Sequence, residues 1–313
     1  MQKVRLGRTG LEVSVAGLGC GGHSRLGTGT GHCERHAVRV VQAAIDLGID
    51  FIDTARVYGT EPAVGKAIRG RRDQLVISTK VGPGFGADGL LLTPQGLTEN
   101  LEKSLTALGT DYVDVYHLHG VRPAQYQHCV EFLVPEMRRQ QEAGKIRFLG
   151  ATETFSRDPQ HQFFKQALPD DHFDVIMVGF SLLNPSARAR VFARTLEKDV
   201  GTLIMFAVRR ALSRPEALRE LLAGLVDGGA VDASLAGKDP LGFVAEHPEV
   251  ESLVQAAYRF CRHEPGAHVI LTGTGNVAHL EANVAYIQAP KLPDEIADQL
   301  EALFGAIDSV SGN

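Results

Sequence analysis

The chain of 313 residues contains no tryptophan, only four cysteines and no apolar run near the ~20 residues that a membrane-spanning helix needs. The cysteines show no pairing pattern, which is typical of a reduced protein, so we expect a cytoplasmic location. Met1 is followed by a charged segment rather than by the apolar core of a signal peptide. We therefore expect neither a disulfide-stapled secreted domain nor a membrane protein.

No charge of one sign dominates the chain. Lys and Arg number 32 against 37 Asp and Glu, which gives a formal net charge of −5. This balance argues against nucleic acid or an anionic membrane surface as a partner. Residues 32–36 (HCERH) contain metal-ligand side chains, but no second cluster follows at zinc-finger spacing, so no metal site is expected.

What is present is a regular alternation of short apolar segments and longer helical patterns. Eight strand-like segments lie near residues 16, 51, 77, 115, 148, 177, 205 and 270, and each leads into a helix-like pattern. Strict alternation implies a parallel sheet. Eight such units over about 270 residues predict an α/β fold, the (β/α)8 or TIM barrel. We expect residues 1–313 to form a single barrel domain, with the glycine-rich residues 224–237 as a loop over one end.

A doubly wound sheet is the competing fold. Residues 17–22 (GLGCGG) match the GxGxxG dinucleotide pattern after a strand. That pattern should open a helix at once, but three more glycines follow within residues 23–31. We interpret the segment as a loop leaving the first barrel strand. Further along, residues 98–108 predict a helix capped by Thr98.

Three ionisable residues close successive predicted strands. Asp53 ends the second strand, Lys80 the third and His119 the fourth, while Tyr58 follows Asp53 in the next loop. Functional residues of a barrel lie where strands end and loops begin, and successive parallel strands are neighbours. Each residue alone has an ordinary structural explanation, but their convergence predicts a catalytic site.

The chemistry of this set is that of proton delivery. A nearby Lys80 ammonium should lower the pKa of Tyr58 from its free value near 10, and Asp53 can hold Lys80 in place. His119 can donate to or accept from a substrate oxygen. Such a site suits protonation of a carbonyl oxygen, but hydride must come from a cofactor, most simply a reduced nicotinamide.

Residues 53–59 (DTARVYG), 77–80 (ISTK) and 116–119 (YHLH) resemble the motifs of the aldo-keto reductases. Residues 5–14 (RLGRTGLEVS) resemble the N-terminal β-hairpin of that family, and residues 273–283 (GTGNVAHLEAN) its cofactor-phosphate segment. The resemblance implies a (β/α)8 barrel with a catalytic tetrad of Asp53, Tyr58, Lys80 and His119, in which Tyr58 is the general acid. The implied reaction interconverts aldehydes or ketones and alcohols with NAD(P)(H).

The resemblance also implies a set of cofactor contacts. In chain order these are Gly19, Cys20, Thr152, Glu153, Met177, Phe206, Arg209, Gly273, Thr274, Gly275, Asn276, His279 and Asn283.

Several of these positions depart from the family pattern. The family places Ser-Asn and Gln where this chain has Thr152, Glu153 and Met177. Thr152 and Glu153 can still bond the nicotinamide amide, whereas Met177 cannot hold it. Phe206 keeps the aromatic face that stacks on the nicotinamide. Arg209, or its neighbour Arg210, is a candidate contact for the pyrophosphate.

Cofactor choice rests on opposing signals. The habit of the family favours NADP(H), but Gly273 and His279 stand where a Lys or Arg usually holds the 2′-phosphate. Thr274, Asn276 and the following helix N-terminus can still bind an anion. NADP(H) is therefore the expectation, with NAD(H) left open.

Two other function classes stay open. A Schiff-base lyase would use Lys80 as its nucleophile, but it leaves residues 273–283 unexplained. A non-catalytic barrel that binds nicotinamide and regulates a partner would account for the altered amide-binding positions. The pattern names a small carbonyl or alcohol substrate only by class, and it indicates no oligomeric state.

Overall fold

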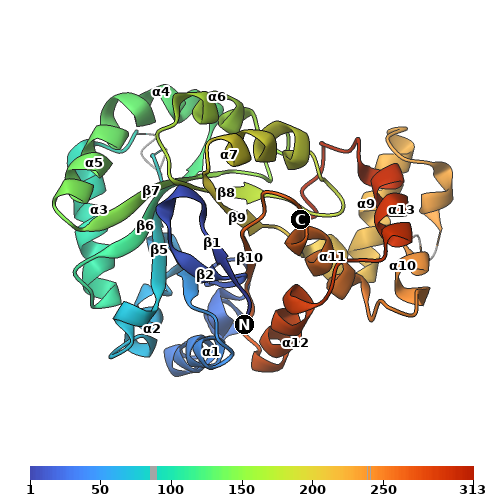
Figure 1. Cartoon of the computed structure of the whole chain (residues 1–313), viewed down its shortest axis with the longest axis horizontal. Coiled ribbons are helices and arrows are strands. Elements are labelled where there is room, and N and C mark those ends of the chain that lie inside the picture. Colours follow the sequence, from blue (N-terminus) through green and yellow to red (C-terminus); the bar gives the residue numbers. More distant parts are fainter. Residues whose placement is uncertain (85–89, 238, 240) are drawn as a thin grey trace.

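The computed structural model describes residues 1–84, 90–237, 239 and 241–313. Eight parallel strands close into a barrel in the order β10-β3-β4-β5-β6-β7-β8-β9 (Figure 1). This confirms the predicted (β/α)8 barrel. The strands are β3 (Ala16–Gly19), β4 (Phe51–Asp53), β5 (Val76–Val81), β6 (Val113–Val121), β7 (Ile146–Glu153), β8 (Val175–Gly179), β9 (Gly201–Met205) and β10 (Val269–Thr272).

An N-terminal hairpin precedes the barrel, as predicted. Strands β1 (Lys3–Arg5) and β2 (Glu12–Ser14) pair antiparallel. Leu6 and Val13 of this hairpin segment are fully buried and pack against Phe51, Val115 and Val269 inside the barrel. The hairpin therefore closes the N-terminal end of the barrel and leaves the opposite end for a site.

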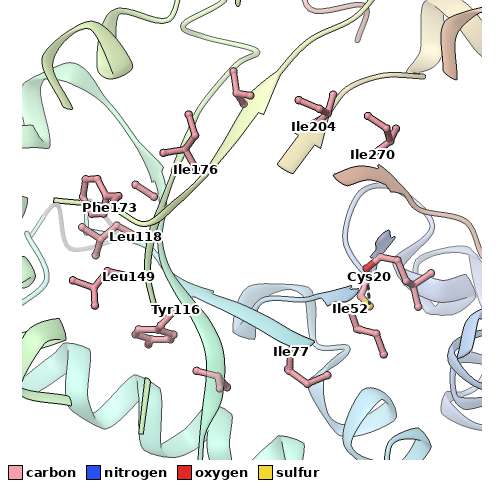
Figure 2. Packing of buried hydrophobic residues seen from close by; sticks show 14 of the residues in the cluster. Cys20, Ile52, Ile77, Tyr116, Leu118, Leu149, Phe173, Ile176, Ile204 and Ile270 are labelled. Carbon is pink, nitrogen blue, oxygen red and sulfur yellow. Dashed lines mark hydrogen bonds between the residues drawn. The ribbon is translucent and has the colours of Figure 1, made fainter. Parts of the chain in front are cut away.

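The outer face of the barrel forms the main hydrophobic core. Figure 2 shows Ile52, Ile77, Tyr116 and Leu149, which come from β4, β5, β6 and β7 in turn. These side chains belong to one buried cluster with helix residues such as Leu101. Because side chains alternate along a strand, Asp53 and Lys80 point to the opposite, inner face.

Helices surround the barrel in the expected alternation. They are α1 (Glu34–Asp46), α2 (Glu61–Ala67), α3 (Pro94–Leu108), α4 (Tyr126–His128), α5 (Val134–Glu142), α6 (Gln162–Asp170), α7 (Ala193–Glu197) and α12 (Val277–Gln288). Helix α3 begins before the predicted residue 98. Its N-cap is Thr93, whose side chain accepts a hydrogen bond from the Gly96 N–H, and Pro94 suits the first turn. Thr98 instead donates to Glu136, so the predicted Thr98 cap is wrong.

The expected loop is found over only part of the glycine-rich residues 224–237: residues 224–227 end a helix, and residues 228–237 form turns and the 3-10 helix η8 (Ala233–Ala236). The region forms α8 (Arg210–Ser213), α9 (Pro215–Asp227) and α10 (Gly242–Glu246), which pack with α11 (Leu253–Arg262) and α13 (Asp294–Phe304). Leu218, Leu222 and Leu225 lie at helical spacing on α9 and are buried in this second cluster. The buried apolar stripe therefore stabilises a helix here despite Gly224. Figure 1 shows α9, α10 and α13 together beside the barrel.

In the part of the chain that the structure describes, no helix has both the length and the apolar character needed to cross a membrane. The same residues contain no group of three or more His, Cys, Asp or Glu side chains arranged to hold a metal ion.

Candidate active site

The four predicted catalytic side chains lie together at the C-terminal end of three adjacent strands. Asp53 ends β4, Lys80 lies near the end of β5, and His119 lies near the end of β6. Tyr58 follows Asp53 in the short 3-10 helix η3 (Arg56–Tyr58), which ends at Gly59 with a positive φ of 72°. Glycine adopts this left-handed conformation without strain, and the resulting tight turn brings Tyr58 back over the strand end.

His119 is directed by an irregularity in its strand. The pairing of β6 with β7 shifts register between Leu118 and Val121, and Gly120 has a positive φ of 62°. The Gly120 N–H donates to Thr152 Oγ1 at 2.7 Å instead of continuing the ladder. A bulge of this kind re-aims the neighbouring side chain. It accounts for His119 reaching Tyr58 at the mouth of the barrel.

A buried ion pair anchors the site. Lys80 Nζ lies 2.6 Å from Asp53 Oδ2 and 2.7 Å from the Thr54 carbonyl oxygen. Ser78 donates to the other Asp53 oxygen at 2.8 Å. The side chain of Lys80 is 0% exposed and that of Asp53 is 5% exposed. Because both charges are removed from water, this geometry fixes the ammonium and its partner tightly.

The protonation states follow from burial and from this pair. Burial lowers the pKa of Lys80, but Asp53 and Tyr58 raise it, and the net shift is upward. Burial raises the pKa of Asp53, and Lys80 offsets part of that rise. Each partner therefore favours the charged form of the other, and burial opposes both charges.

Tyr58 and His119 form the face of the site that meets a substrate. Tyr58 OH lies 3.1 Å from His119 Nε2, and the Lys80 ammonium lies 5.1 Å from the centre of the Tyr58 ring. Burial, with a smaller effect from Lys80, lowers the pKa of His119 to about 3, so the imidazole is neutral.

The expected lowering of the Tyr58 pKa is wrong in its net direction. Burial raises the pKa of Tyr58, and the Lys80 ammonium offsets only part of that rise. The sequence shows which charge is near the phenol, but it does not show how far water is excluded. Tyr58 is consequently protonated around neutral pH, which is the state a proton donor needs.

His117 is a buried imidazole that the sequence analysis did not single out. It lies two residues before His119 on β6. Neither of its ring nitrogens has a hydrogen-bond partner among the described residues. Its ring occupies the space beside Gly150, where a Cβ would collide with it. Burial and then Lys80 lower the pKa of His117 well below its ordinary value.

His117→Leu should make the protein less sensitive to acid. The native state keeps His117 neutral while the unfolded chain binds a proton below about pH 6.5, so this residue costs stability as the pH falls. The leucine variant lacks that cost and leaves no orphaned nitrogens. Melting temperatures at about pH 7 and about pH 5 should therefore drop less for the variant than for the wild type. An equal drop in the two proteins would contradict the assignment.

The C-terminal segment expected to hold phosphate lies beside the first barrel strand. A Cβ at Gly273 would lie 2.7 Å from the Gly19 carbonyl oxygen, so the two backbones approach closely. Asn276 caps α12 by accepting hydrogen bonds from the N–H groups of Ala278 and His279 at 2.9 and 3.3 Å. The Thr274 hydroxyl accepts from the Asn276 N–H. The helix N-terminus is thus partly satisfied within the chain.

Other predicted cofactor residues are directed inward. Cys20 is fully buried, and its N–H donates to the Asp53 carbonyl oxygen, so its thiol does not line the mouth of the barrel. Asn283 donates to Thr272 Oγ1 at 2.9 Å. Gly275 accepts a hydrogen bond from His36 Nε2 at 2.6 Å, which ties the segment to α1.

The expected role of Glu153 at the nicotinamide amide does not fit its contacts. Its carboxylate lies 2.9 Å from His161 Nδ1 and accepts the Gly179 N–H at 2.8 Å. The side chains of Glu153 and His161 are both 0% exposed. Met177 is buried among apolar residues inside the barrel. Of the three altered positions, Thr152 alone has a hydroxyl group that could donate a hydrogen bond to the oxygen of a carboxamide.

Phe206 and Arg209 stack on each other. The Arg209 guanidinium lies 3.9 Å from the centre of the Phe206 ring. Phe206 also packs edge-on against Phe155, with ring centres 5.3 Å apart. Phe206 has a positive φ of 69°, which turns the chain at the end of β9.

Sequence reasoning missed several supporting contacts. Ser78 and the Thr54 carbonyl lie within the quoted motifs, and His36 lies in residues 32–36, but no role was assigned to any of them. Gly21 was interpreted only as part of a loop, yet a Cβ there would lie 2.6 Å from the Tyr58 ring. The signal that could have found Gly21 is its place directly after the first strand, where it faces the loop that carries Tyr58.

Comparisons with known proteins identify the family. The model of the aldo/keto reductase family matches residues 18–304, so the chain belongs to this family. The uncharacterized oxidoreductase YqkF of Bacillus subtilis is 26% identical over 312 residues, which is 96% of each chain. L-galactose dehydrogenase of Arabidopsis thaliana is 33% identical over 154 residues, or 47% of each chain.

A solved structure agrees over nearly the whole length. The holo form of aldo-keto reductase AKR11C1 from Bacillus halodurans superimposes with a TM-score of 0.76 at 26% identity, and the match covers 98% of this chain and 97% of that one. The resemblance stated from the sequence is therefore confirmed. Family and fold together support an oxidoreductase that uses a nicotinamide cofactor and acts on small carbonyl compounds.

Proposed function

We propose that this protein reduces aldehydes or ketones with NAD(P)H, or catalyses the reverse oxidation, with Tyr58 as the general acid. The observation that carries the proposal is the contact of Tyr58 with a neutral His119 at 3.1 Å beside the buried Lys80–Asp53 pair. A protonated phenol held by an imidazole and a fixed ammonium is suited to deliver a proton where negative charge develops.

Part of the expected lining suits a nicotinamide dinucleotide. Gly19, Gly273 and Gly275 bring bare backbone together at one side of the mouth, and Thr274 adds a hydroxyl. Phe206 offers a ring face. The carboxamide end fits less closely, since Thr152 is its remaining polar partner there. The dinucleotide, when bound, supplies the hydride for the carbonyl carbon.

The side chains of this protein then have separate tasks. His119 Nε2 and Tyr58 OH position the carbonyl oxygen between them. When negative charge develops on that oxygen, Tyr58 gives its proton to it. The Lys80 ammonium stabilises the phenolate that remains, and Asp53 holds Lys80 in place. In oxidation, the same phenolate takes the proton back from the alcohol.

The contacts of Lys80 disfavour the Schiff-base alternative. A Schiff base requires a neutral amine, whereas Asp53 and Tyr58 raise the pKa of Lys80 on balance. Treatment with borohydride and a carbonyl compound should leave Lys80 unmodified. Trapping at Lys80 would restore the lyase hypothesis.

We propose NADP(H) as the preferred cofactor and leave NAD(H) as the alternative outcome. The usual preference of the family supports NADP(H). At the expected phosphate position, however, the exposed His279 stands in place of a Lys or Arg. Because an imidazole is a weaker partner for a phosphate than the Lys or Arg that usually stands there, the preference should be small.

The test is the loss of reduced-nicotinamide absorbance with an uncharged aromatic aldehyde, run with NADPH and then with NADH. We expect turnover with both and a higher kcat/KM with NADPH. Nicotinamide binding without turnover on a panel of carbonyl compounds would favour the regulatory barrel. Absence of both binding and turnover would overturn the proposed function.

A further inference from the structure

Arg209 carries a charge that the proposed reaction does not use. Its side chain is partly buried at the mouth of the barrel, and its Nε atom is buried with no hydrogen-bond partner. Within the described residues, no acidic side chain forms an ion pair with it, and its guanidinium stacks on the Phe206 ring. Removing a guanidinium from water without a counter-ion is costly, so the position is suited to an anion that arrives with a ligand.

The electrostatics of the site leave Arg209 as its uncompensated charge. Lys80 and Asp53 cancel each other at 2.6 Å. His119 is neutral and Tyr58 is protonated, for the reasons given above. Of these five side chains, Arg209 is therefore the one whose charge is not balanced by an ion pair.

Arg209 also stands close to the reacting position. A Cβ on Gly22 would lie 3.5 Å from Arg209 Nη1, and a Cβ on the preceding Gly21 would lie 2.6 Å from the Tyr58 ring. The Tyr58 ring and the Arg209 guanidinium therefore lie against neighbouring residues of the loop that contains Gly21 and Gly22. An anion held by Arg209 would lie beside the carbonyl group that Tyr58 protonates.

We propose that Arg209 binds the carboxylate of the substrate, so that the preferred substrates are carbonyl compounds that carry a carboxylate group. This inference rests on the proposed function. A guanidinium matches a carboxylate with two parallel N–H donors, which an uncharged aldehyde cannot use. The pyrophosphate of the dinucleotide is the other oxyanion that could take this position, and the experiment separates the two.

The experiment compares 4-carboxybenzaldehyde with its uncharged methyl ester in the wild type, Arg209→Gln and Arg214→Gln. Arg214 is exposed, and its substitution changes the net charge by the same amount. We expect the wild type to favour the carboxylated aldehyde in kcat/KM by about ten- to a hundredfold, the worth of a charge-assisted hydrogen bond. Arg209→Gln should bring that ratio close to one, and Arg214→Gln should keep it.

A binding measurement gives a second readout that is independent of turnover. Calorimetry should show that benzoate binds the wild type more tightly than benzamide does, and that Arg209→Gln removes the difference. If Arg209→Gln instead lowers kcat/KM equally for both aldehydes and weakens NADPH binding, Arg209 holds the pyrophosphate and the inference is overturned. A wild type that reduces both aldehydes equally also overturns it, while the proposed function stands. No turnover of either aldehyde and no NADPH binding would instead contradict the proposed function itself.

Discussion

Tyr58→Phe should lower kcat for aldehyde reduction by about 10²- to 10⁴-fold, the usual contribution of a positioned general acid. The phenyl ring keeps the shape that packs against Gly21, so the fold should be preserved. The substitution removes the hydroxyl proton and leaves water as the alternative donor. Steady-state rates with saturating NADPH give the comparison.

The binding of NADPH separates this loss from a general failure of the site. Nicotinamide fluorescence should show a Kd within a few-fold of the wild type, because the ring of Tyr58 remains. A kcat reduced by less than about tenfold would mean that another group, such as His119 or bound water, donates the proton.

The pH profile of the wild type offers an independent check of the same assignment. Because burial raises the pKa of Tyr58 above its ordinary value of 10.0, the phenol stays protonated through the neutral and mildly alkaline range. Reduction should therefore not fall between about pH 7 and about pH 9 through loss of this proton. A fall with a midpoint near pH 8 would show that a bound ligand or Lys80 lowers the Tyr58 pKa more than burial raises it.

The fold was accessible from the sequence because its signals are local and repeated. Short runs such as residues 175–178 (VIMV) are apolar and mostly β-branched, and glycines such as Gly109 and Gly144 end the intervening helices with positive φ. The position of the region after Phe206 beside the barrel could not be predicted from its glycines or from the apolar stripe of α9. That stripe has meaning only once α11 and α13, far along the chain, are known to lie against it.

The candidate site, like the fold, could be predicted only in part. Asp53, Lys80 and His119 were predicted to converge because the order of parallel strands dictates it, and the structure brings them together with Tyr58. The partner of Glu153 could not be predicted. His161 reaches the carboxylate because His161 itself has a positive φ, and no sequence pattern indicates that conformation. The stacking of Arg209 on Phe206 likewise depends on a positive φ at Phe206 that no pattern indicated.

Lys80→Met should destabilise the protein by about 3–5 kcal/mol, because it leaves the Asp53 carboxylate buried without its cation. Ser78 would remain as one hydrogen-bond donor to that carboxylate at 2.8 Å, which is not sufficient to replace an ammonium. Urea unfolding gives the free energy of unfolding. Lys66→Met is the matched control, since the Lys66–Glu34 pair is 52% and 46% exposed and should contribute about 0–1 kcal/mol.

The double variant Lys80→Met with Asp53→Asn tests whether the loss comes from the stranded charge. Asparagine is neutral and keeps an acceptor for Ser78, so the double variant should be more stable than Lys80→Met alone, giving a coupling energy of about 1–3 kcal/mol.

Because the pKa of Lys80 is raised above 10.5, the stabilisation is present below that pH and is lost only as the pH rises through the higher native value. The difference between wild type and Lys80→Met should shrink as the pH falls, because the Asp53 carboxyl that has lost its cation, and whose pKa burial raises, then takes up a proton. A loss below about 1 kcal/mol for Lys80→Met, or additive effects in the double variant, would show that the pair is reached by water. Lys80 would then be too weakly fixed to stabilise the Tyr58 phenolate, and the proton-transfer role of the site would need another cation.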